Sequence, residues 1–322
     1  MLGSTLGVGA VGSALPVPGA VGTVGGGDGT QATAELAWAR DQESLRLTYG
    51  PRELLRYQLR KPARGGASVE SGGYLHPVTT PAGTVVTEVG PADHRHHRGV
   101  FLGWVEMRGT DAADFWGWGE PAPTAGRRIE NVTVEGLPPT LGVARFRATN
   151  AWKAGARRMV LEEVRVTLAF REGATVLDYV TRLTVDAPVT VARWAFGGFA
   201  VRTRIDGAVA PIGPEGAVRR ASPRHTDPDS NWPDAPWYGL HLKFRDGKEA
   251  TVAVAGREAN PPTSWHVVPG IGLINPSVTA KGALRLVPEE PLVLRYRIMA
   301  FDGAPAVASL KRLGEGWYFG TS

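Results

Sequence analysis

Three histidines lie within four consecutive residues of this chain, at His94, His96 and His97. Imidazole titrates near neutral pH and binds metal ions readily, so such a group can move protons or hold a metal. Asp93 precedes the group and Arg98 follows it. The carboxylate would orient an imidazole, and the guanidinium would hold an anionic or hydroxyl-rich ligand. This segment is therefore the predicted chemical centre of the protein.

Two kinds of chemistry remain open for these histidines. In an extended segment, His94 and His96 would share one face and His97 would lie on the other, because side chains alternate. Same-face imidazoles would act as acid and base on opposite sides of a sugar ring. Alternatively, His94 and His96 would bind a divalent metal together with His266, which lies in a predicted strand. The structural alternative to both is a hydrogen-bonded, partly buried corner.

Tryptophan is the second signal, with ten residues in a chain of 322. Two segments, 111–127 and 222–239, combine Trp with Pro and acidic residues and are predicted to be long functional loops over one rim of the fold. Flat aromatic faces stack on the apolar faces of sugar rings. Trp104, Trp116 and Trp237 are therefore predicted to bind substrate, the alternative being that each is a buried loop anchor.

The elements that must position these residues are strands. Apolar and polar residues alternate through 160–170 and 177–185 around a Gly-containing turn, which predicts a hairpin, and 240–254 predicts another around Asp246-Gly247. Helical signals are weak and confined to 306–313 and 52–59. Many short strands with little helix predict an all-β fold, a large antiparallel β-sandwich in which residues 34–322 form one domain.

Carboxylates are harder to assign from alternation alone. Glu162 shares the parity of the apolar residues in its strand, whereas Glu163 and Arg165 lie on the polar face. A polar sheet face is usually solvated. If that face is the floor of a cleft, Glu163 is a candidate base. Arg202 likewise lies either on a solvated face or on the floor of a cleft.

Composition excludes several classes of function. The chain has no cysteine, so it holds no disulfide, thiolate metal site or cysteine nucleophile. Its net charge of +5 comes from scattered basic residues without a long basic run, which argues against a nucleic-acid surface. No stretch is apolar and long enough to cross a bilayer.

The first 33 residues are rich in Gly, Ala and Val, with no charged residue before Asp28. Two alternatives remain open. Residues 2–17 are similar to the apolar part of an export signal whose twin-arginine leader was lost by a start site assigned too late, which would make the protein exported. Otherwise the segment is a disordered Gly-rich tail and the protein is cytoplasmic.

A series of short motifs adds a resemblance. In chain order they are Leu75–Gly83, Asp93–Gly99, Asp114-Phe115-Trp116, Glu163 with Arg165, Asp178, Gly198–Arg202, Asn260-Pro261, Trp265-His266, Asn275-Pro276 and Leu294–Arg297. This series resembles a bacterial family labelled methane oxygenase PmoA-like, over roughly residues 74–303. The resemblance implies a β-rich protein without membrane spans that is linked to sugar catabolism, with an architecture similar to the galactose-mutarotase supersandwich.

Carried over by position, the family's recurring polar residues fall on Asp93, His94, His96, His97, Arg98, Glu163, Arg202, His266 and Asn275. The chain departs from the family at Gly103-Trp104, where Gly-His is expected, and at 268–272, where an Arg-Asp-Tyr-Gly run is missing.

These observations predict a carbohydrate-active enzyme that acts on a sugar or keto-glycoside in a concave cleft, as a hydrolase, lyase or epimerase. His94 or His97 would be the general acid/base and Glu163 the opposing base. The remaining predicted catalytic residues are His96 and His266, and the predicted substrate-binding residues are Asp93, Arg98, Trp104, Trp116, Arg202, Trp237 and Asn275. A small carbohydrate is the expected partner. The alternative is a non-catalytic carbohydrate-binding protein that uses the same aromatic and arginine side chains.

Overall fold

A computed structural model describes residues 35–63 and 66–320. The predicted leader, residues 1–33, lies outside the described residues. Within them the chain forms 21 strands, two short 3-10 turns and one α-helix. The all-β prediction is confirmed, and both predicted hairpins are present, as β10–β11 and β16–β17.

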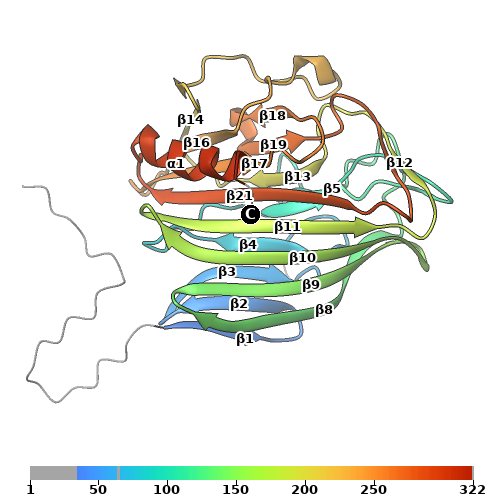
Figure 1. The fold of residues 1–322 in the computed structure, drawn as a ribbon, viewed down its shortest axis with the longest axis horizontal. Helices are drawn as coiled ribbons and strands as arrows, with labels where there is room; N and C mark the ends of the chain where they lie inside the picture. The colour runs from blue at the N-terminus through green and yellow to red at the C-terminus, as the bar shows by residue number, and fades with distance from the viewer. Residues whose placement is uncertain (1–34, 64–65, 321–322) are drawn as a thin grey trace, which may run out of the picture. The chain divides into compact units, whose positions relative to one another are not determined.

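Two large antiparallel sheets make up the fold (Figure 1). The eight-stranded sheet has the order β1 (Leu36–Arg40), β2 (Ser44–Tyr49), β3 (Arg52–Gln58), β4 (Tyr74–Val78), β5 (Val100–Gly103), β13 (Gly198–Arg202), β19 (Leu273–Ser277) and β18 (Ser264–Val268). The nine-stranded sheet has the order β15 (Gly216–Ala217), β14 (Ala208–Gly213), β16 (Trp237–Lys243), β17 (Glu249–Gly256), β21 (Leu292–Asp302), β11 (Ala174–Thr184), β10 (Arg157–Arg171), β9 (Val143–Ala154) and β8 (Arg127–Thr140). A small third sheet has the order β20 (Leu284–Leu286), β12 (Val189–Val191), β6 (Met107–Arg108) and β7 (Ala112–Ala113).

The main core lies between the inner faces of the two large sheets. Alternation along each strand supplies it, for example with Val100 and Leu102 from β5 and Val164 and Val166 from β10. The antiparallel sandwich predicted from alternation is thus confirmed, because both sheets bury one face against the other.

Part of the outer face of the nine-stranded sheet is covered by α1 (Val307–Tyr318), which packs on β17 and β21 (Figure 1). Leu310 and Leu313 of this helix pack on a separate apolar cluster that contains Trp237. Trp237 is fully buried there, so it anchors the helix. The prediction that Trp237 stacks on a substrate does not fit this position.

The outer face of the eight-stranded sheet carries a third apolar cluster. Phe101 of β5, Ala200 of β13 and Leu273 of β19 point to this face, opposite to their neighbours in the main core. The same parity directs Arg202 and His266 to this face. The pleat of three neighbouring strands therefore brings predicted site residues together on one side of one sheet.

Candidate functional site

The histidine segment is built from turns. The amide of His94 donates to the carbonyl of Pro91 at 3.1 Å, and the amide of His97 donates to the carbonyl of His94 at 2.9 Å. Gly99 ends the segment with φ +63°, and a Cβ atom there would lie 2.1 Å from the carbonyl oxygen of Leu75. The extended geometry expected from the sequence is wrong, because two successive turns fold the segment back on itself.

As a result, all three imidazoles meet. The rings of His94 and His97 stack with centroids 4.7 Å apart and an interplanar angle of 14°. His96 packs edge-on against His97, also at 4.7 Å. The expected division into two faces is replaced by a single cluster of three rings.

A buried arginine connects this cluster to a carboxylate. The guanidinium of Arg202 is 1% exposed and donates from Nη2 to both carboxylate oxygens of Asp93, at 3.0 and 3.1 Å. Asp93 Oδ2 lies 3.0 Å from Nδ1 of His94, and Nη1 of Arg202 lies 3.3 Å from Nδ1 of His97. Arg202 and Asp93, predicted to bind substrate, contact each other and thereby position two imidazoles.

Arg98 lies in the interior and is fully buried. Its guanidinium donates to the carbonyl oxygens of His96, Trp116 and Phe115 at 3.2, 3.0 and 2.8 Å and stacks over the ring of Phe101. These contacts join the histidine turns to the tryptophan loop. Arg98 is therefore a structural residue, and the prediction that it grips the ligand is not retained.

The tryptophan loop is shaped by one carboxylate. Asp114 accepts the amides of Gly117 and Gly119 at 2.7 and 2.6 Å, which folds the loop into a tight turn. Gly117 has φ +107°, and a Cβ atom there would lie 2.8 Å from Cβ of His96. The loop can therefore pack directly on the histidine segment, and it presents Trp116 and Trp118 beside it.

His266 reaches the same place from β18. It is 3% exposed, and its Nδ1 lies 2.8 Å from Oδ1 of Asn231. Asn275 is its cross-strand neighbour on β19, but its side-chain amide binds the backbone of Gly197 and Phe199. Asn275 thus fixes the start of β13, and the prediction that it binds substrate does not fit.

These elements enclose a pocket of about 300 Å³. Its lining is aromatic, aliphatic and imidazole in character, made of His94, His96, His97, Trp116, Trp118, Phe196, Pro223, His225, His266, Val268, Ile271 and Leu273. Both predicted functional loops contribute to it, one through Trp116 and Trp118 and the other through Pro223 and His225.

Seven of the twelve lining residues were not among the predicted site residues, and two of these seven are Trp118 and His225. Their rings meet edge-on at 5.7 Å, so they face each other from the two loops. Trp118 is half-buried, whereas Trp116 is fully buried and forms the inner wall. Trp118 is thus the indole with an accessible face. Its position within the Trp-rich loop was the available signal, and His225 had none beyond its loop.

Burial keeps most of these imidazoles neutral. Desolvation, with the nearby positive charges as a second cause, lowers the pKa of His96 to about 4 and that of His97 much further. Burial also lowers the pKa of His266 to about 3, with His225 as a second cause. Although burial raises the pKa of Asp93, hydrogen bonds from His94 and Arg202 hold it below its usual value. At neutral pH, His96, His97 and His266 are therefore uncharged and Asp93 is ionised.

The predicted metal site is not assembled. In the part of the chain that the structure describes, no group of three or more His, Asp, Glu or Cys side chains could hold a metal ion. Nδ1 of His94 and Nδ1 of His266 contact Asp93 and Asn231 respectively. The proposed ligand set His94, His96 and His266 is therefore corrected to a set of hydrogen-bonding imidazoles.

Two further predicted residues lie elsewhere. Glu163 is on the outer face of β10, where its carboxylate pairs with Arg182 at 2.9 Å and is 45% exposed. It lies on a different sheet from His266 and does not line the pocket, so it is not the opposing base. Trp104 is 1% exposed and packs against Trp152 in the main core. Glu163 was predicted from the polar face of its strand and Trp104 from its place beside a loop, and neither residue lines the pocket.

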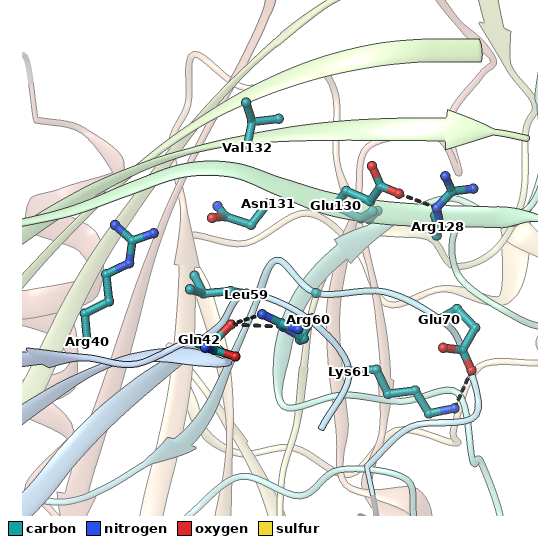
Figure 2. Close-up of a pocket in the computed structure, with 12 residues that line it drawn as sticks. Arg40, Gln42, Leu59, Arg60, Lys61, Glu70, Arg128, Glu130, Asn131 and Val132 are labelled. Atoms are coloured by element: carbon teal, nitrogen blue, oxygen red, sulfur yellow. Dashed lines mark hydrogen bonds and ion pairs between the residues drawn. The ribbon is translucent and has the colours of Figure 1, made fainter. Parts of the chain in front are cut away.

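A second hollow, of about 550 Å³, lies between the end of β1 and strand β8 (Figure 2). Its charged side chains are largely paired with one another, as Lys61 with Glu70 at 2.6 Å and Arg128 with Glu130. None of the predicted site residues lines it. The histidine pocket gathers five of the predicted site residues and is therefore the candidate functional site.

A family profile described as a family of unknown function (DUF6807) matches residues 44–314. The chain belongs to this family. The resemblance to the methane oxygenase PmoA-like family was therefore wrong, since the matching family is a different one whose function is not assigned. A comparison with curated proteins finds no match.

Solved structures similar to this chain include a GH36 alpha-galactosidase, AgaB, from Geobacillus stearothermophilus, at 10% identity and a TM-score of 0.41. The match covers 84% of this chain and 41% of that one, so the chain spans well under half the length of that enzyme. Another is a galactose mutarotase related enzyme from Lactobacillus acidophilus, at 8% identity and a TM-score of 0.36, covering 84% of this chain and 98% of that chain. At these values neither likeness carries an argument about the chemistry of this chain.

No helix among residues 35–63 and 66–320 has the length and hydropathy to span a membrane.

Proposed function

We propose that this protein is a carbohydrate-active enzyme that binds one sugar ring in the histidine pocket and transfers a proton with His94. The observation that carries the proposal is the pairing of His94 Nδ1 with Asp93 at 3.0 Å, beside a pocket walled by aromatic rings. A carboxylate at Nδ1 orients the imidazole and leaves Nε2 as the base. Arg202 holds this carboxylate in place from the interior.

The size and lining of the pocket support a sugar as ligand. About 300 Å³ is at the lower end of the range for small-molecule sites, which fits a single ring better than a chain of sugars. Trp118 and Phe196 offer flat apolar surfaces, with ring centroids 5.4 Å apart. The imidazoles supply hydrogen bonds to hydroxyl groups.

Proton transfer next to a carbonyl, as in a keto-sugar, suits these groups best. Nε2 of His94 would take the proton from the carbon beside the carbonyl, and the electron pair of the C–H bond would move onto the carbonyl oxygen. Delivery of a proton from water to the other face of that carbon inverts it, and the proton held by His94 is released to solvent. Loss of a β-substituent with its bonding electrons gives elimination instead. Both outcomes begin with the same proton abstraction.

The expected result for His94→Gln is a loss of at least about 100-fold in proton exchange, because general-base catalysis contributes that much or more. The measurement is proton NMR in D₂O with a panel of hexoses, ketoses and keto-glycosides, following the signal of the proton next to the carbonyl. Ligand binding is measured separately by calorimetry. His241→Gln is the matched control, because His241 lies on β16 beside Glu249 and outside the pocket.

Undiminished exchange in His94→Gln would overturn the catalytic role. Binding of a sugar by the wild-type protein without exchange or conversion of any panel member would favour the alternative, a non-catalytic carbohydrate-binding protein. No binding of any panel member would overturn the carbohydrate assignment itself.

A further inference from the structure

The histidine pocket offers a ligand imidazoles rather than permanently charged side chains. None of its twelve lining residues is Lys, Arg, Asp or Glu. Polar recognition therefore depends on imidazoles, and the two most buried are His97 and His266, at 2% and 3% exposure. Ring contacts through Trp116 and Phe196 connect these two histidines along the wall of the pocket. The distance between ring centroids is 5.3 to 5.5 Å at each contact.

The hydrogen-bond partner of His97 assigns its tautomer. Nδ1 lies 3.3 Å from Nη1 of Arg202, and a guanidinium can only donate. Nδ1 must therefore accept, so the single proton of the neutral ring is on Nε2. His97 presents a donor at its free nitrogen.

The partner of His266 assigns the opposite tautomer. Nδ2 of Asn231 donates to the carbonyl of Ala195 at 2.6 Å and to Oγ of Ser264 at 3.3 Å, which directs Oδ1 of the same amide toward His266. Oδ1 accepts from Nδ1 of His266 at 2.8 Å. The proton is therefore on Nδ1, and Nε2 of His266 carries a lone pair.

Both free nitrogens are accessible, and both rings line the pocket. Among the described residues neither Nε2 has a hydrogen-bond partner, and neither is among the buried side-chain atoms that are fully enclosed without a partner. Some of the small exposed area of each ring is thus at Nε2. The low pKa of His266, about 3, keeps its lone pair free through the physiological range.

We propose that the pocket selects an uncharged sugar by means of these two neutral imidazoles of opposite tautomer. Nε2–H of His97 donates to a ligand oxygen, which in a keto-sugar is the carbonyl that gains charge on proton abstraction. Nε2 of His266 accepts from a ligand hydroxyl. A phosphate or carboxylate would be desolvated without an opposite charge and is disfavoured. The ligand class rests on the proposed function, whereas the tautomers are properties of the free protein.

The first test is long-range ¹H–¹⁵N NMR of the free ¹⁵N-labelled protein, with His97→Gln and His266→Gln to assign the signals. The expected spectrum shows His97 protonated at Nε2 and His266 at Nδ1. In Arg202→Gln the signal of His97 is expected to shift toward a mixture of tautomers, whereas Arg202→Lys, which retains a donor, is expected to keep it at Nε2. A wild-type spectrum with either proton on the other nitrogen overturns the inference, whether or not the Arg202 variants fold.

The second test compares affinities by calorimetry for glucose, galactose and mannose against their uronic acids and phosphorylated forms. We expect each neutral sugar that binds to do so at least tenfold more tightly than its anionic counterpart. Equal or tighter binding of the anionic forms overturns the selectivity while leaving a sugar site in place. Absence of all sugar binding with both tautomers as assigned overturns the proposed function instead.

Discussion

Replacing Glu162 with alanine will destabilise the protein by about 4 kcal/mol or more, because four donors lose their acceptor in the interior. Glu162 is 1% exposed and lies between the two sheets. Its carboxylate accepts from Asn150 and Trp152 at 3.0 Å on one oxygen, and from Thr181 at 3.0 Å and Tyr179 at 3.4 Å on the other.

The network also joins the two sheets. Nδ2 of Asn150 donates to the hydroxyl of Tyr57 on β3 at 2.7 Å, while the same residue donates to Glu162 on β10. Burial raises the pKa of Glu162, and the four hydrogen bonds act in the opposite direction. Removal of the carboxylate thus opens a cavity and leaves polar groups unpaired in the same place.

The measurement is urea unfolding followed by tryptophan fluorescence, with Glu163→Ala as the matched control. Glu163 is the next residue, but it points outward and its pair with Arg182 is exposed, so its loss will cost less than about 1 kcal/mol. Glu162→Gln will cost about 2 kcal/mol, since the hydroxyls of Thr181 and Tyr179 can turn to accept from the new amide. Equal decreases in the free energy of unfolding for Glu162→Ala and Glu163→Ala would contradict the position of Glu162 between the sheets.

Strand alternation was the part of the fold that could be predicted. The opposite parities of Glu162 and Glu163 are read directly from the sequence, and the structure places one inside and the other outside. The two hairpins were predictable for the same reason. Which of two sheets a strand joins depends on pairings between distant segments, such as β13 with β5 and β19, and no local pattern encodes these.

The histidines of the site could be predicted from the sequence, but the roles of the polar residues around them could not. The composition of residues 93–98 identified the histidines, but the expected extended geometry failed because backbone hydrogen bonds close two turns there. Arg98 and Asn275 were assigned to a ligand, although both bind backbone carbonyls in the interior. A polar side chain in a sequence does not reveal whether its partner is a ligand or a buried carbonyl group.

Tryptophan was ambiguous for a related reason. Trp104, Trp116 and Trp237 are all fully buried, in three different clusters, and only Trp116 lines the pocket. The accessible indole belongs to Trp118, two residues further along the same loop. The turn that Asp114 closes determines which of Trp116 and Trp118 has an accessible ring. This turn depends on the conformation of the loop and not on residue type.

Acidification will destabilise the protein steeply below pH 6.5. The folded protein keeps His97 and His266 neutral, with the pKa of His266 lowered to about 3 and that of His97 lowered further, chiefly by burial. In the unfolded chain both return to the ordinary pKa of about 6.5 and take up protons below it. The unfolded state then binds more protons, so the free energy of unfolding falls as the pH falls.

The expected size of this effect follows from the proton difference. Each histidine that stays neutral only in the folded state lowers the free energy of unfolding by at most about 1.4 kcal/mol per pH unit. Because unfolded histidine is not yet fully protonated at pH 6, His97 and His266 together give about 2.5 kcal/mol between pH 6 and pH 5. The window extends down toward pH 3, where folded His266 also takes up a proton. His76 and His96, whose pKa values are lowered to about 4, act in the same direction.

Urea unfolding at half-unit steps from pH 8 to pH 4.5 measures this dependence. The free energy of unfolding is expected to be nearly constant above pH 7 and to fall below pH 6.5. The slope is expected to correspond to at least about two more protons bound by the unfolded state than by the folded state. His266→Asn keeps a hydrogen-bonding side chain that does not titrate, so its slope should be smaller by about one proton. Equal slopes for the wild type and His266→Asn between pH 6.5 and pH 5 would mean that His266 takes up a proton as readily in the folded protein as in the unfolded chain. The inference that His97 and His266 are a pair of neutral imidazoles with opposite tautomers would then be wrong.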